Sequence, residues 1–290
     1  DSSIDKTILV LASMLLAVIS YRFIEQPFRK LRTGSTKIKV LSGLALVMIP
    51  TLMLFGLDFA KTQARESYGN VYASTVLSGC DFLNDVCVVG EDTAAKKVLL
   101  YGDSHIYQLI PIFVDYTKTH DVQITTCALV CNGEQYSTIK DGTFAPGNFD
   151  LVINSFKTNS EEISREKRLD LATTFSTFAS DRGAKHLIVL DNPFYAESVA
   201  PRRIRMPELE SLSRADQDAV ANPITQNWKD DAGEGTFFYD PFTVLCNATE
   251  CPLEKDGKVL YLDNNHLSMP GVQLLEPSLI NMVNQILAQQ

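Results

Sequence analysis

The feature that most constrains the fold is a short apolar run that leads through a tight turn into a helical pattern. Residues 98–101 are continuously apolar, which is typical of a strand buried on both faces. Gly102 ends this run, and apolar residues then recur at helical spacing over residues 106–113. The sequence therefore predicts a strand, a turn and a helix in direct succession, with Ser104 at the turn.

A serine at that turn has two interpretations. Backbone N–H groups at the start of a helix are free and favour a developing anion, so Ser104 is well placed to be a nucleophile beside half of an oxyanion hole. The simpler interpretation is that Ser104 only caps the helix. The first interpretation requires a general base elsewhere in the chain.

His266 is the best candidate for that base among the four histidines of the chain. It follows Asp263 by three residues, in a polar loop that precedes the last predicted helix. An Asp-x-x-His loop can set the carboxylate against one ring nitrogen and leave the other nitrogen for the serine, as a catalytic triad requires. Asp240 is the alternative carboxylate for His266.

The other three histidines are weaker candidates. His105 is adjacent to Ser104, and neighbouring side chains at a helix start point apart, so His105 is expected to be a poor base. His120 and His186 are interpreted as surface or structural residues. The triad hypothesis therefore depends on Ser104, Asp263 and His266.

The motifs Gly102-Asp103-Ser104-His105 and Asp263-x-x-His266 together resemble the SGNH (GDSL-like) hydrolase superfamily, over about residues 78–290. Members carry the nucleophile in the first motif and the acid and base together in the last. The resemblance implies that Ser104, Asp263 and His266 are catalytic.

The rest of the chain predicts an α/β fold. Further strands are expected at residues 122–127, 149–156, 185–190 and 236–245, and helices at 161–181 and 271–289. Alternating strands and helices favour a mostly parallel sheet flanked by helices, of the SGNH or flavodoxin-like kind. Active residues then gather at the carboxyl ends of the strands.

The oxyanion hole is less well defined by the sequence. The superfamily usually has Gly-x-Asn-Asp after its third strand, and this chain departs from that pattern. Asn154 at the strand end is the first candidate donor and Asn159 the second, although either could be a loop-capping asparagine. Gly133 is the candidate for a backbone donor from the loop after the second strand.

Six cysteines fall in three close pairs. Of the 15 possible connectivities, we expect the three local ones. These are Cys80–Cys87, Cys127–Cys131 and Cys246–Cys251. No Cys-x-x-Cys pair or Cys/His cluster indicates zinc, so no metal site is predicted. Disulfides imply an oxidising compartment.

Two apolar runs near the start of the chain predict membrane helices. Residues 40–57 are long enough to cross a bilayer, and residues 7–20 read as a shorter or truncated helix, with buried core helices as the alternative for both. The loop between them is rich in Lys and Arg and is therefore expected in the cytoplasm. The second span then delivers the cysteine-rich remainder to the opposite side.

Residues 21–29 resemble the end of the membrane domain in acyltransferase-3 family proteins, many of which carry a C-terminal SGNH domain. By this resemblance, residues 1–39 end that membrane domain, 40–57 form one transmembrane helix, 58–95 are a periplasmic linker and 96–290 are the SGNH domain. The chain would be the C-terminal piece of a longer protein, located at a bacterial inner membrane with the SGNH domain in the periplasm.

The family resemblance implies transfer of an acyl group, commonly acetyl, to a hydroxyl of a cell-envelope carbohydrate such as lipopolysaccharide O-antigen. Acetyl-CoA is the expected ultimate donor through the membrane domain, and no cofactor is expected in the SGNH domain. A periplasmic carbohydrate esterase and a non-catalytic carbohydrate-positioning domain remain as alternatives. The net charge of −9, without a basic patch, argues against a nucleic-acid partner. The acceptor sugar, the acyl group and the oligomeric state do not follow from the sequence.

Overall fold

The computed structural model describes residues 18, 21–22, 26, 76–77, 80–82, 86–127, 139, 148–157, 165–195 and 211–289. The chain divides into two units, Asp1–Ala64 and Arg65–Gln290, and the fold described below belongs to the second. Within the ranges just given, no helix is long and apolar enough to cross a membrane. The expected spans lie outside these ranges except for Val18, so they stay predictions.

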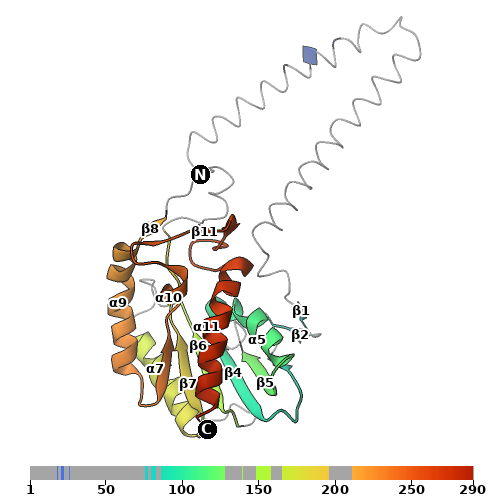
Figure 1. Ribbon diagram of the computed structural model, residues 1–290, viewed down its shortest axis with the longest axis vertical. Coiled ribbons are helices and arrows are strands. Elements are labelled where there is room, and N and C mark those ends of the chain that lie inside the picture. Colours follow the sequence, from blue (N-terminus) through green and yellow to red (C-terminus); the bar gives the residue numbers. More distant parts are fainter. Residues whose placement is uncertain are drawn as a thin grey trace, which may run out of the picture. The chain divides into compact units, whose positions relative to one another are not determined.

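A six-stranded sheet forms the centre of the second unit (Figure 1). In spatial order its strands are β3 (Cys87–Val89), β5 (Val122–Cys127), β4 (Lys96–Gly102), β6 (Leu151–Ser155), β7 (Lys185–Val189) and β9 (Thr236–Tyr239). All neighbours pair in parallel except β3, which is antiparallel to β5. The expected mostly parallel sheet is confirmed.

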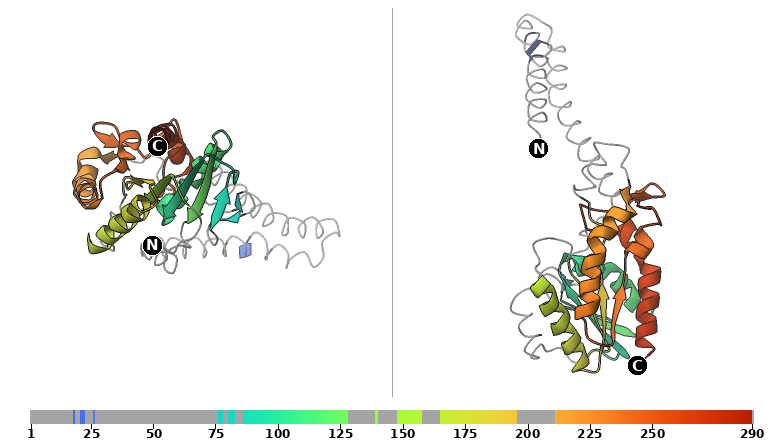
Figure 2. Two further views of the ribbon diagram at one scale, coloured as in Figure 1. Left: turned by 90° about the horizontal axis from the view of Figure 1, so that it is seen from below. Right: turned by 90° about the vertical axis from the view of Figure 1, so that its left-hand side faces the viewer.

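Helices cover both faces of this sheet (Figures 1 and 2). On one face, Val98 and Leu100 of β4 belong to a buried cluster with α5 (Ile110–Thr117) and α11 (Met269–Leu287). On the other, Leu99 and Tyr101 pack with α7 (Arg165–Ser180) and Trp228 of α9 (Arg214–Asp231). Because side chains alternate along a strand, a continuously apolar strand supplies both cores.

Short elements complete the unit. They are α4 (Ser104–Tyr107), α10 (Phe242–Leu245), and the paired strands β1 (Val76–Leu77) with β2 (Cys80–Asp81), β8 (Leu212–Ser213) with β10 (Glu250–Cys251), and β11 (Glu254–Lys255) with β12 (Lys258–Val259). The expectation of a strand through Leu245 is wrong past Tyr239. The Asp240 carboxylate accepts a hydrogen bond from the Phe242 N–H, and the chain turns at Pro241 into α10.

Two of the expected disulfides, Cys80–Cys87 and Cys246–Cys251, are present. Cys127 is also disulfide-bonded. Its expected partner, Cys131, lies outside the described residues. The second disulfide closes the loop after α10, on the path that leads the chain to His266.

The strand order places a topological switch point at β4. The chain passes from β4 to β5 on one side, and returns to β6 on the other side of β4. In open α/β sheets, ligands bind in the crevice at the carboxyl ends of the strands beside such a point. Ser104 directly follows the carboxyl end of β4, so the fold places it at this crevice.

Candidate active site

The turn that carries Ser104 is held in place by hydrogen bonds of Asp103 and by the close approach of Gly102 to β6. Asp103 caps α4, since its Oδ1 accepts a 2.8 Å hydrogen bond from the His105 backbone N–H. Its Oδ2 accepts a 2.8 Å hydrogen bond from the Lys157 backbone N–H, beyond the end of β6. A side chain at Gly102 would collide with the Ser155 carbonyl oxygen, so glycine is required where β4 and β6 approach closely.

The loop before α11 presents His266 in a similar way. Asp263 Oδ1 accepts hydrogen bonds from the backbone N–H groups of Asn265 (2.9 Å) and His266 (2.8 Å). Asp263 Oδ2 lies 2.6 Å from His266 Nδ1. Burial raises the pKa of Asp263, but the hydrogen bonds from the His266 side chain and from these backbone groups outweigh burial and hold it at about 2. The carboxylate is therefore ionised at neutral pH.

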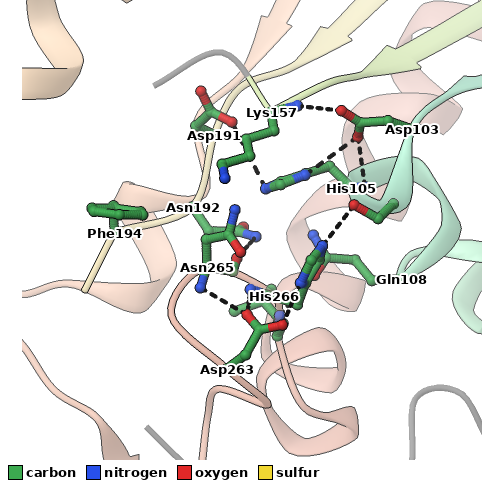
Figure 3. A network of polar contacts seen from close by, with 12 residues as sticks. Asp103, His105, Gln108, Lys157, Asp191, Asn192, Phe194, Asp263, Asn265 and His266 are labelled. Atoms are coloured by element: carbon green, nitrogen blue, oxygen red, sulfur yellow. Dashed lines mark hydrogen bonds and ion pairs between the residues drawn. The ribbon is translucent and has the colours of Figure 1, made fainter. Parts of the chain in front are cut away.

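Ser104 and His266, 162 residues apart in sequence, meet at the carboxyl end of β4. His266 Nε2 lies 2.6 Å from Ser104 Oγ. Because the ionised Asp263 can only accept, His266 Nδ1 carries its proton toward Asp263, and Nε2 is left to accept from the serine hydroxyl. Figure 3 shows His266 between Asp263 and Gln108.

Gln108 connects the two halves of this arrangement. It follows Ser104 by four residues and is buried, with 3% of the residue exposed. Its Oε1 accepts a 2.7 Å hydrogen bond from the backbone N–H of Leu267, the residue after His266. The sequence analysis missed this residue, because nothing in the sequence pairs Gln108 with a loop 159 residues away.

The remaining carboxylate and histidine candidates lie apart from this contact. Asp240, the alternative partner for His266, instead accepts from the Phe242 N–H. His120 is exposed and contacts Thr119 Oγ1 and the Tyr116 carbonyl oxygen. His186 is buried in β7, and burial lowers its pKa to about 3, so it is neutral.

The oxyanion candidates are not brought to Ser104 by any contact of the described residues. Asn154 is buried, donates from Nδ2 to the Tyr101 carbonyl oxygen at 3.2 Å, and accepts at Oδ1 from His186 Nε2 at 2.6 Å. These are the contacts of a side chain that ties β6 to β4 and β7. Asn159 and Gly133 lie outside the described residues, so the donor assignment stays a prediction.

His105 is the residue whose environment the sequence did not indicate. Its side chain is 1% exposed and lies between Asp103 and Asp191 (Figure 3). Burial lowers the pKa of His105, but the carboxylates of Asp103 and Asp191 outweigh burial and leave it above the ordinary value. The same ion pair lowers the pKa of Asp103, against the opposing effect of its burial.

A cleft adjoins the site on the side of β7 and α9. It is lined by polar, aromatic and aliphatic side chains, including Asp191, Asn192, Phe194, Gln217 and Ile224. Asn192 Nδ2 also donates a 3.0 Å hydrogen bond to the Asn265 carbonyl oxygen, within the Asp263–His266 loop. The wall of the cleft is thus continuous with the loop that holds the histidine. In the part of the chain that the structure describes, no group of His, Cys, Asp and Glu side chains could hold a metal ion.

The chain belongs to the family of SGNH domains fused to AT3 domains, whose model matches residues 73–281. The SGNH resemblance and the association with AT3 domains are thereby confirmed for the family. The match does not include an AT3 domain in this chain.

Solved structures with a similar fold include the periplasmic domain of a lipopolysaccharide acetyltransferase from Salmonella ser. Paratyphi A. That domain is 14% identical, and the match covers 66% of this chain and 85% of that one with a TM-score of 0.48. A mutant of an acetyl-xylooligosaccharide esterase from Geobacillus is also 14% identical, over 67% of this chain and 94% of that one, with a TM-score of 0.39. No curated protein matches the chain.

Proposed function

We propose that this domain transfers an acyl group, most simply acetyl, through Ser104 to a hydroxyl of a cell-envelope carbohydrate such as O-antigen. The observation that carries the proposal is the unbroken series of contacts from Asp263 through His266 to Ser104, with 2.6 Å at each step. These are the group types and the order of contacts that activate a serine for covalent catalysis.

The proposed chemistry proceeds in two displacements. Ser104 Oγ attacks the acyl carbonyl carbon while His266 Nε2 takes the hydroxyl proton, and the ionised Asp263 stabilises the imidazolium that forms. The tetrahedral intermediate collapses to an acyl-serine, and His266 returns the proton to the leaving group. A carbohydrate hydroxyl then attacks the acyl-serine, its proton passes through His266 to Ser104 Oγ, and the carbohydrate ester is released.

The negative charge on the intermediate requires hydrogen-bond donors. In the described part of the chain, nothing accepts a hydrogen bond from the Ser104 backbone N–H, so this group is available for the oxyanion. Asn154 remains a candidate for a second donor only if its amide leaves the Tyr101 carbonyl. Asn159 and Gly133 are the other proposed donors.

Transfer is favoured over hydrolysis by the family, since its members are SGNH domains joined to AT3 domains. A membrane acyltransferase module in the same full-length protein would supply acyl groups from cytoplasmic acetyl-CoA. The two local disulfides support placement on the oxidising side of a bacterial inner membrane, in the periplasm. A periplasmic esterase would use the same three residues with water as the acceptor.

The cleft beside β7 and α9 is the proposed place for the acceptor. Its lining offers amide and carboxylate groups for sugar hydroxyls and the Phe194 ring for a sugar face. In the described residues this lining holds no Lys or Arg. An uncharged stretch of the carbohydrate therefore suits it better than a phosphorylated one.

Cells that carry the full-length protein provide the test. Envelope polysaccharide is isolated from cells with wild type, Ser104→Ala, or the exposed control Ser180→Ala, and its ester-linked acetyl is measured at equal expression. We expect acetylation to disappear in Ser104→Ala alone. If acetylation is retained in Ser104→Ala, the domain is a non-catalytic one that positions the carbohydrate. If instead acetylation rises when Ser104 is removed, the domain is an esterase.

A further inference from the structure

A buried charged cluster lies next to the proposed triad and takes no part in the chemistry given above. His105 Nδ1 lies 3.3 Å from Asp103 Oδ1, and His105 Nε2 lies 3.9 Å from Asp191 Oδ1. Within the described residues neither ring nitrogen has a partner at hydrogen-bond geometry, and both contacts are ion pairs when the ring is protonated. A histidine between two carboxylates is stabilised as the imidazolium, in which both nitrogens carry protons.

The cluster joins the carboxyl ends of three neighbouring strands. Asp103 follows β4, and its second oxygen binds the backbone N–H of Lys157, which follows β6. Asp191 follows β7 and is 8% exposed. A single cation at His105 therefore lies between carboxylates from two strand ends, and one of these carboxylates binds the backbone at the third strand end.

The same ring contacts the proposed general base. The ring centroids of His105 and His266 lie 5.1 Å apart, with an angle of 43° between the ring planes. The contact is not part of the Asp263 hydrogen bonds, so His266 is held from two sides. Asp263 fixes the Nδ1 edge of the His266 ring, and His105 supports the ring itself.

We propose that His105 is a positioning residue, a buried imidazolium that is bound between Asp103 and Asp191 and keeps the His266 ring aligned with Ser104. The kinetic part of this inference rests on the proposed function. This role explains why His105 is adjacent to Ser104 in sequence. One short turn then supplies both the proposed nucleophile, Ser104, and the residue that positions its proposed base, His266.

The arrangement makes activity depend on pH through His105. The groups that face it are Asp103 from the turn before α4, Lys157 after β6, Asp191 after β7 and the His266 ring from the loop before α11. The two carboxylates keep the pKa of His105 above its ordinary value, while burial and the Lys157 charge oppose this. Above that raised pKa the cation is lost, the carboxylates repel each other, and the support for His266 weakens.

The kinetic test uses the full chain in detergent, with 4-nitrophenyl acetate as the acyl probe. We expect His105→Gln to lower kcat about 10- to 100-fold with KM nearly unchanged, since misplacement of a catalytic group by about an ångström has effects of this size. We expect kcat of wild type to fall at basic pH as His105 loses its proton, and this fall to be absent in the variant. The exposed His120→Gln should match wild type. An unchanged kcat and an unchanged basic limb in His105→Gln would overturn the inference.

Asp191→Asn extends the test to the partner of His105. If the two residues act through one ion pair, the double variant should be no slower than the worse single variant, because effects of residues in direct contact are not additive. Fully multiplied losses would show that they act independently, which contradicts the proposed cluster.

A second readout does not depend on activity. The chain has four histidines, so ¹⁵N ring signals can be assigned by single substitutions. We expect both His105 nitrogens to be protonated at pH 6, below the ordinary histidine value, in wild type and in Ser104→Ala. The His266 signals should move in His105→Gln but not in His120→Gln. If Ser104→Ala hydrolyses the probe as fast as wild type, the proposed function fails, and these signals alone decide the inference. A neutral His105 ring would refute it.

Discussion

Two aspartate–histidine pairs flank Ser104, and they differ in what the second ring nitrogen meets. In the Asp263–His266 pair, Nδ1 faces the carboxylate and Nε2 faces the serine hydroxyl. In the Asp103–His105 pair, Nδ1 again faces a carboxylate, but Nε2 faces a second carboxylate, that of Asp191. The His266 side chain is 16% exposed and that of His105 is 1% exposed.

Because of these partners, His266 is suited to exchange a proton, whereas His105 is suited to keep one. A carboxylate on one side and a hydroxyl on the other orient the ring and leave an acceptor for the proton to be moved. Carboxylates on both sides hold the proton instead, and their attraction outweighs the opposing effect of burial on the pKa of His105. The residue types and the sequence neighbourhood are alike, so the tertiary partner of Nε2 decides the role.

The largest expected effect is on the two histidines. His266→Gln should lower kcat for 4-nitrophenyl acetate by about 10⁴-fold or more, as loss of a triad member does, whereas the loss in His105→Gln is at most about 100-fold. Purified full chain in detergent serves for both measurements. Equal losses of kcat would mean that both histidines take part in proton transfer, which contradicts the separate roles given to the two pairs.

The two candidate carboxylates for His266 give the next contrast. Asp263→Asn should slow the reaction of Ser104 with a fluorophosphonate probe by about 10³- to 10⁴-fold, because the ring then loses its fixed orientation and tautomer. Asp240→Asn should react at close to the wild-type rate, since Asp240 contacts the Phe242 backbone instead. A large loss of reaction rate in Asp240→Asn would indicate that Asp240, and not Asp263, is the carboxylate partner of His266.

The pairs should also differ in how they link stability to pH. Asp263 has a folded pKa of about 2 against an ordinary value of 3.8, so its contribution is present above pH 3.8 and is lost as the pH falls toward 2. His105 has a folded pKa raised above 6.5, so its contribution is present below pH 6.5 and is lost as the pH rises through the raised value.

Chemical denaturation across pH checks this linkage. The free energy of unfolding should fall less steeply on the acid side in Asp263→Asn and less steeply on the basic side in His105→Gln, each relative to wild type. His120→Gln should follow the wild-type curve on both sides. A basic limb that remains unchanged in His105→Gln would mean that His105 is not the group that loses its proton there.

The smallest expected effect concerns the link between the two halves of the site. Gln108→Ala leaves the buried Leu267 N–H without its acceptor and should lower the free energy of unfolding by about 1–3 kcal/mol. The exposed Gln226→Ala is the matched control and should change it little. Equal stabilities for the two variants would show that water replaces the Gln108 contact.

Much of the sheet could be predicted because its strands are continuously apolar. The strand at residues 122–127 was predicted with its exact observed bounds, and both faces of β4 are covered as its composition indicates. Helix α9 was not predicted, because its residues are mostly polar and only Trp228 is buried. The expected strand beyond Tyr239 failed, since apolar composition alone cannot distinguish β9 from the short helix α10.

The sequence by itself determined the two turns of the site. Oδ1 of Asp103 accepts from the N–H of His105, and Oδ1 of Asp263 accepts from the N–H groups of Asn265 and His266, so one oxygen of each carboxylate acts within three residues of its own position. Such short-range hydrogen bonds depend on chain connectivity and residue type, which is why motifs of a few letters indicate them.

Only the tertiary structure decided which histidine meets Ser104 and which is enclosed. The Ser104–His266 contact joins residues 162 apart, and Asp191 reaches His105 from the end of another strand. Both contacts exist because parallel strands end at one edge of the sheet, and because Gln108 binds the loop before α11. Local sequence specifies neither the packing of that loop nor the approach of Asp191, which together with Asp103 favours the charged form of His105.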